Sequence, residues 1–194
     1  MRWTRWTALG ASMTAAVVAV ATWSCAKPAQ NTPAPLTQEQ KVARGEYLTT
    51  IMGCNDCHTP GTFYGQPDFS RKLSGSELGW VGPWGTTYAR NLSPDAETGL
   101  GSWSEDDIAK ALRTGQRPNG TEILPPMPWP MYTNLTDDDV HSIAAYLKSL
   151  PAVSHKVPDK LAPGAKPAPN DWVLPKPLAW DAPKAAPDSA AAAH

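Results

Sequence analysis

The chain has 194 residues, among them 21 Pro, 14 Gly, 9 Trp, 3 Cys and only 2 Phe. This length suits one folded domain with extensions better than two full-sized domains. Seventeen Lys and Arg stand against 18 Asp and Glu, so the formal net charge is −1. Because a chain with no basic excess lacks the cations that neutralise phosphates, we exclude nucleic-acid binding as a function class.

Residues 1–25 have the layout of an export signal, in which two arginines precede an apolar stretch from Ala8 to Ala21. Two modes of cleavage remain open: ordinary signal removal before Lys27, and lipidation of Cys25 as in bacterial lipoproteins. The uncharged run from Trp6 to Ala26 is also long enough for an uncleaved membrane anchor, although its composition favours cleavage. We therefore expect an exported, periplasmic protein, either free or attached to the membrane.

The composition divides the rest of the chain into a linker, a domain and a tail. Residues 26–35 read AKPAQNTPAP and are expected to be a Pro-rich linker, and residues 36–150 are expected to fold. Residues 151–194 hold nine Pro and twelve Ala, which predicts an extended tail. Four large apolar residues interrupt this tail, and we expect them to lie as a strap on the domain surface, with the docking of a partner as the alternative: Trp172, Val173, Leu174 and Trp180.

Three helices are expected within the domain, each with a capping residue at its start. The first follows Thr37 and runs into Gly53, and the second follows Ser104 and stops at Gly115. The third follows Thr136, with three aspartates beside the positive end of its dipole, and halts at the next proline. All three present apolar residues at helical spacing.

A long irregular segment separates the first two helices. The 45 residues from Thr59 to Trp103 contain eight Gly and four Pro and show no sustained period of 2 or 3.6, so no sheet is expected there. A loop of this length is uncommon inside a compact domain, and three short helices make a thin core. A large buried cofactor would account for both features.

The pentapeptide Cys54-Asn55-Asp56-Cys57-His58 is the C-x-x-C-H pattern of covalent c-type haem attachment. Thiols at this spacing can each add to one vinyl group of the same porphyrin, and His58 then lies under the iron as its proximal ligand. The alternatives are a thioredoxin-like motif, a zinc half-site and a plain disulfide. The first lacks a βαβ pattern and the second lacks another ligand pair, so we expect one covalently attached haem c.

Four side chains beyond the motif are candidates for the sixth iron ligand: Met127, Met131, His141 and His155. The third helix places His141 on a solvated face, and His155 lies in the tail, where we expect no fixed geometry. Both methionines lie in a segment whose prolines restrict the backbone, so we expect one of them to bind the iron. A thioether ligand raises the reduction potential and leaves no open position, which suits electron transfer better than oxygen chemistry.

Together these residues resemble the bacterial class I mono-haem cytochromes c, especially those that accompany periplasmic or membrane dehydrogenases. The resemblance covers about residues 36–150. Besides the haem motif, it rests on these segments: RGEYL at 44–48, NLSPD at 91–95, TGLG at 98–101 with Trp103, MPW at 127–129 and AYLKSL at 145–150.

The resemblance implies an all-α, cytochrome c-like haem domain of three main helices with long irregular loops that wrap the haem. Its first and last helices would cross where Gly45 approaches Tyr146. In the family's pattern the Met of a Met-Pro-aromatic segment is the distal iron ligand, which matches Met127 and leaves Met131 as the alternative. By position, Arg90 and Asn91 would lie near the haem propionates.

The function implied by the resemblance is that of an electron carrier, not an enzyme. It would pass single electrons from a dehydrogenase to a respiratory acceptor, such as another cytochrome or a terminal oxidase. The alternative is a haem-based sensor or small-ligand-binding module with an open sixth position, and a peroxidase is disfavoured because a Met ligand is expected. We expect Trp84, Trp103 and Trp129 to pack against the porphyrin, with a docking role as the alternative.

Overall fold

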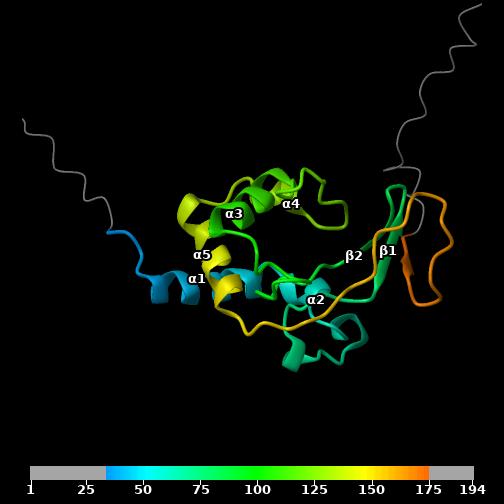
Figure 1. The fold of residues 1–194 in the computed structure, drawn as a ribbon, viewed down its shortest axis with the longest axis horizontal. Helices are drawn as coiled ribbons and strands as arrows, with labels where there is room; N and C mark the ends of the chain where they lie inside the picture. The colour runs from blue at the N-terminus through cyan, green and yellow to red at the C-terminus, as the bar shows by residue number, and fades with distance from the viewer. Residues whose placement is uncertain (1–33, 175–194) are drawn as a thin grey trace, which may run out of the picture. The chain divides into compact units, whose positions relative to one another are not determined.

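The computed structural model describes residues 34–174 and shows a mostly helical domain (Figure 1). The expected all-α fold class is confirmed. No helix among residues 34–174 is long and apolar enough to cross a membrane. The helices are α1 (Gln38–Ile51), α2 (Cys54–His58), η1 (Thr62–Tyr64), η2 (Phe69–Arg71), α3 (Glu105–Thr114), α4 (Trp129–Tyr132) and α5 (Asp137–Ser149).

The three predicted helices α1, α3 and α5 begin at the predicted caps. The Thr37 hydroxyl accepts a hydrogen bond from the Gln40 backbone at 3.3 Å, while the Gln40 side chain accepts one from the Thr37 backbone at 2.9 Å. Ser104 and Asp107 make the same reciprocal pair at α3, and Thr136 caps α5. These bonds satisfy backbone N–H groups that a helix start leaves without partners.

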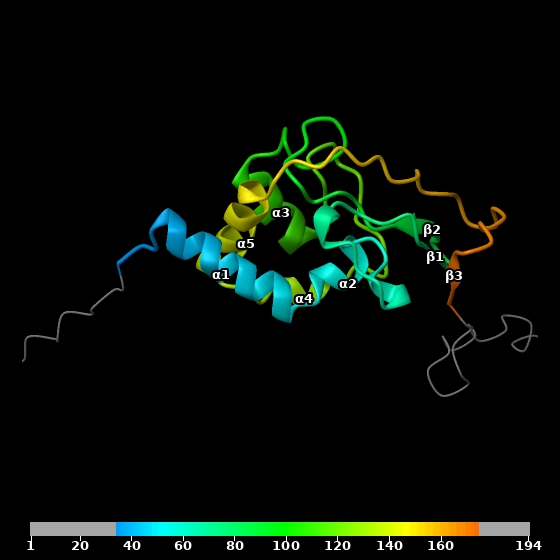
Figure 2. The same cartoon turned by 90° about the horizontal axis from the view of Figure 1, so that it is seen from below.

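Helices α1 and α5 cross at a glycine, as the resemblance implies. A Cβ atom built on Gly45 would lie 2.6 Å from the Cβ of Tyr146 and closer still to the carbonyl oxygen of Ser142. The two backbones therefore approach at a distance that only a residue without a side chain allows. The Arg44 guanidinium reaches Asp139 of α5 beside this crossing, with Nε 2.6 Å from Oδ1. Figure 2 shows α1 and α5 lying side by side.

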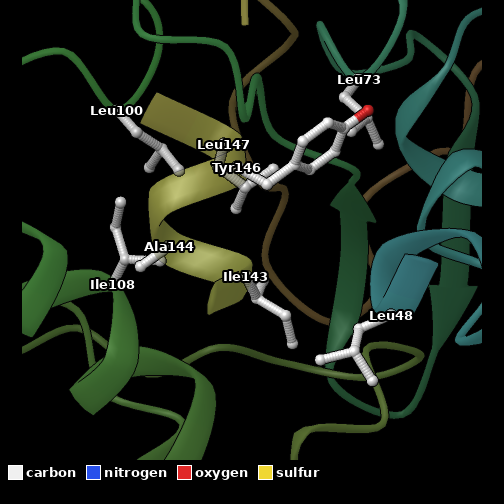
Figure 3. Packing of buried hydrophobic residues seen from close by; sticks show 8 residues of the cluster. All are labelled: Leu48, Leu73, Leu100, Ile108, Ile143, Ala144, Tyr146 and Leu147. Atoms are coloured by element: carbon white, nitrogen blue, oxygen red, sulfur yellow. The ribbon is translucent and has the colours of Figure 1, made fainter. Parts of the chain in front are cut away.

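The hydrophobic core is built mainly around α5. Helix α1 supplies Leu48 and α3 supplies Ile108, while two leucines come from the irregular segment between α2 and α3. This segment therefore contributes to the core as well as connecting the helices. Figure 3 shows the eight core residues: Leu48, Leu73, Leu100, Ile108, Ile143, Ala144, Tyr146 and Leu147.

The expectation of no sheet between residues 59 and 103 is wrong. Strands β1 (Gly79–Gly82) and β2 (Gly85–Tyr88) form an antiparallel hairpin with a two-residue turn, and β3 (Trp172–Val173) pairs parallel with β1. The sheet order is β2-β1-β3. Strands of two to four residues are too short to establish a period in the sequence, and β3 comes from the tail.

An aromatic cluster joins the tail to the sheet. The ring of Trp172 stacks on that of Trp80 at a centroid distance of 5.1 Å, and the ring of Phe63 meets both edge-on at 5.0 and 5.3 Å. The Leu174 backbone donates to the Val81 carbonyl at 3.0 Å. The expected strap is confirmed for Trp172, whereas Trp180, the export segment and residues 26–33 of the linker lie outside the described residues.

Candidate functional site

The C-x-x-C-H motif forms the whole of α2, so its two thiols project from a single helical turn. Gly53 precedes this turn with φ +68°, in the left-handed region that favours glycine, and separates α2 from α1. Cys54 and Cys57 are half-buried and not bonded to each other. Burial raises the pKa of Cys54 to about 11 and also raises that of Cys57. Because a dithiol redox site lowers a thiol pKa, the upward direction of both shifts disfavours the thioredoxin-like alternative.

His58 at the end of α2 has the geometry of a metal-binding imidazole. The residue is 8% exposed, and its Nδ1 donates to the Arg90 carbonyl oxygen at 2.7 Å. The proton is therefore on Nδ1, and Nε2 carries the free lone pair, with no hydrogen-bond partner within residues 34–174. Burial lowers the pKa of His58, which favours the neutral form that binds metals.

Two loops hold the backbone around His58. The Gly75 N–H donates to the His58 carbonyl at 2.8 Å, and the Leu73 N–H donates to the Thr59 hydroxyl at 3.0 Å. The second loop supplies the Arg90 carbonyl. The position of the imidazole is therefore set by residues 73–75 and 90, which follow it by 15 or more positions in the chain.

The segment that carries Met127 is held at three points. The Thr87 hydroxyl donates to the Pro125 carbonyl at 2.7 Å, and the Trp129 ring lies directly against Gly115. Tyr132 is 8% exposed; burial, reinforced by the neighbouring Cys54 and Cys57, raises its pKa to about 12. This segment therefore ends beside the thiols of α2.

The two methionines of this segment have different environments. Met127 is half-buried and lies between the restrained residues Pro125 and Trp129, whereas Met131 is 70% exposed. His141 is 35% exposed and lies 3.1 Å from the Asp106 carboxylate, in agreement with the expected solvated face. The expectation that His155 has no fixed geometry is wrong, since its ring is bonded to Ser74 and Glu77 of a single loop.

The expected role of Asn91 at the haem propionates stays a prediction, and its side chain already has partners within the protein. Asn91 is 1% exposed, and its amide donates to the Thr98 hydroxyl at 3.0 Å and to the Val153 carbonyl at 2.7 Å. Its amide oxygen accepts from the Ser93 backbone at 2.9 Å. Both amide hydrogens are used within the chain, so Asn91 holds the loop together.

The Arg90 side chain also points to the protein, because its guanidinium donates to the Pro158 carbonyl at 3.0 Å. The three tryptophans have protein contacts as well. Trp84 lies over Gly82, Trp129 lies over Gly115, and Trp103 packs beside the core. Their contacts with a porphyrin and with a partner protein both remain predictions.

Sequence reasoning missed three contributors to this site: the Arg90 carbonyl, Tyr132 and His155. No sequence signal identifies a backbone acceptor. The sequence could have indicated Tyr132, because it directly follows Met131 and continues the same proline-restrained segment. His155 lies in a segment whose composition indicates an extended chain, and composition does not indicate which residues its ring contacts.

The chain is similar to cytochromes c and to cytochrome subunits of dehydrogenases. Over 125 residues it is 37% identical to the cytochrome c subunit of a quinone-type alcohol dehydrogenase of Gluconobacter oxydans, covering 62% of this chain and 24% of the relative. It is 33% identical over 136 residues to the cytochrome subunit of a fructose dehydrogenase of Gluconobacter japonicus, covering 70% and 26%. It is also 33% identical over 128 residues to a diheme cytochrome c-type protein of Cereibacter sphaeroides, covering 64% and 42%.

The chain thus spans about a quarter of the length of the two dehydrogenase subunits. The family model for cytochrome c, whose members carry covalently bound haem c, matches residues 42–151, more than half of the chain. The protein therefore belongs to the cytochrome c family.

Proposed function

We propose that the protein is a single-electron carrier with one covalently attached haem c, which accepts electrons from a dehydrogenase and passes them to a respiratory acceptor, a cytochrome or a terminal oxidase. The observation that carries this proposal is the orientation of His58, which presents a neutral Nε2 while Nδ1 is held by a carbonyl. Similarity to cytochrome subunits of dehydrogenases supports the donor. The single C-x-x-C-H motif supports one haem, although one relative is diheme.

Three residues of α2 would hold the haem. Cys54 and Cys57 would bind the porphyrin through thioethers, and His58 would bind the iron through Nε2. When bound, the haem iron supplies one-electron chemistry by changing between Fe(II) and Fe(III). The Arg90 carbonyl fixes the His58 tautomer, orients its ring and raises its basicity.

Met127 is proposed as the distal iron ligand, in preference to Met131. Its half-buried side chain lies between the restraints at Pro125 and Trp129, whereas Met131 is 70% exposed. A restrained thioether keeps water and small ligands from the iron and favours the ferrous state. This arrangement suits electron transfer in which no substrate bond is made or broken.

We further propose that the protein is exported to the periplasm, on the strength of the signal-like residues 1–25. Its mature end would be either Lys27 or a lipidated Cys25. The mass of the N-terminal peptide from protein purified out of its host distinguishes the two. An intact residue 1 in that peptide would refute cleavage.

The proposed electron-carrier function is tested by replacing Met127 and Met131 in turn with leucine, which keeps the side-chain volume and removes the sulfur. In Met127→Leu we expect a lower reduction potential and carbon monoxide binding to the reduced protein, while the matched control Met131→Leu keeps both properties of the wild type. The opposite pattern would assign the ligand to Met131. If neither substitution changes the potential, neither Met127 nor Met131 binds the iron, and the sensor alternative gains support.

A further inference from the structure

The segment that follows α5 lies beyond residues 42–151 of the family match, yet it contacts both loops that hold His58. These loops are residues 73–77, which bind the His58 carbonyl, and residues 89–93, which bind its Nδ1. The loops also bond to each other, since the Ser76 N–H donates to the Ala89 carbonyl at 3.0 Å. The two loops therefore form one hydrogen-bonded support around His58.

His155 attaches the segment to the first loop. Its Nδ1 donates to the Ser74 carbonyl at 2.9 Å, and its Nε2 lies 2.7 Å from the Glu77 carboxylate. The side chain is 11% exposed, and its backbone N–H donates to the Thr98 hydroxyl at 3.0 Å. Ser74 directly precedes Gly75, whose N–H binds the His58 carbonyl. The residue that His155 binds is thus the direct neighbour of the residue that binds His58, the proposed iron ligand.

Other residues of the segment attach it to the second loop. The Asn91 amide donates to the Val153 carbonyl at 2.7 Å, and the Arg90 guanidinium donates to the Pro158 carbonyl at 3.0 Å. Val157 is 4% exposed and packs so closely on Gly75 that a Cβ there would lie 2.7 Å from its Cγ1. The segment therefore contacts both loops at once.

We propose that residues 153–158, called here the clamp, set the position of the Arg90 carbonyl relative to the His58 ring, with His155 as the positioning residue. The inference rests on the proposed ligation of iron by His58. A carbonyl held close to Nδ1–H raises the basicity of the imidazole, which favours Fe(III). Loosening the clamp weakens this hydrogen bond, so the reduction potential rises.

The experiment uses the full-length, haem-loaded protein and compares His155→Ala with His141→Ala. The control is closely matched, because the His141 ring also binds one backbone carbonyl, Asp137 at 2.8 Å, and one carboxylate, Asp106 at 3.1 Å. In the reduced protein, NMR follows the exchange of the His58 Nδ1 proton with solvent. We expect His155→Ala to speed this exchange by about tenfold, as for the loss of one or two net hydrogen bonds, and to raise the potential. His141→Ala changes neither.

Rescue separates positioning from a general loss of stability. His155→Gln keeps a side-chain donor for the Ser74 carbonyl, so its exchange rate and potential fall between those of the wild type and His155→Ala. If His155→Ala does not fold, Val157→Ala replaces it, with the 58% exposed Val173→Ala as its control. Equal potentials and exchange rates in test and control would overturn the clamp. A failure of the proposed function differs, because the wild type itself would then lack an iron-bound histidine.

Discussion

The contact between α1 and α5 gives a sharp quantitative prediction for Gly45→Ala. The new Cβ would lie 2.6 Å from the Tyr146 Cβ, whereas carbon atoms in contact are about 3.5–4.0 Å apart. Both this atom and the still closer Ser142 carbonyl belong to or adjoin the α5 backbone, so no side-chain rotation relieves the overlap. Overpacking of this kind costs about 3 kcal/mol, while alanine gains about 1 kcal/mol of helix propensity. We expect a net loss of about 2 kcal/mol.

Denaturant unfolding of the ferric haem protein, followed by far-UV circular dichroism, measures this loss. The control is Ala43→Gly on the exposed face of the same helix, which reports helix propensity alone and should cost about 1 kcal/mol. Each substitution on its own is thus predicted to destabilise the protein. Helix propensity alone would instead make Gly45→Ala stabilising and Ala43→Gly destabilising. A Gly45→Ala protein as stable as the wild type would show that the helices do not meet as closely as the structure has them.

Two further predictions concern the loops between α2 and α3. Asn91→Ala removes three hydrogen bonds from a 1% exposed site and should lower the free energy of unfolding by about 3 kcal/mol, against less than about 1 kcal/mol for the exposed Asn119→Ala. Hydrogen bonds from Ser70 and then Arg71 lower the pKa of Asp68 from 3.8 to about 2. The contribution of the Asp68 carboxylate to stability is therefore complete above about pH 4 and is lost as the pH falls towards 2. In acid titrations of the free energy of unfolding, Asp68→Asn should lose less stability than the wild type over this range. Equal losses would contradict the assigned bonds.

The helices were predictable because their signals are local. Thr37 and Gln40, or Ser104 and Asp107, lie three positions apart and form their capping bonds without help from the rest of the fold. The haem motif is likewise contained in five residues. The crossing at Gly45 came from the family resemblance, since no local pattern identifies the partner of a helix face.

The features that were missed depend on residues far apart in the chain. Trp80 and Trp172 stack across a sheet that joins the middle of the domain to its tail, and the tail composition predicts only an extended chain. The hairpin left a weak signal, because the runs Trp-Val and Thr-Thr-Tyr, each preceded by a glycine, favour strands but are too short to show a period. The acceptor for His58 is a backbone carbonyl, which every residue carries and no sequence pattern marks.

The central claim is that the protein holds its iron between a histidine and a methionine, as an electron carrier does. The most direct test is the visible absorption spectrum of the purified full-length protein, oxidised and reduced, with and without carbon monoxide. We predict the weak long-wavelength band that reports sulfur bound to ferric haem, and a reduced spectrum that carbon monoxide leaves unchanged. Absence of that band, with ready binding of carbon monoxide, would contradict the account and indicate an open iron site.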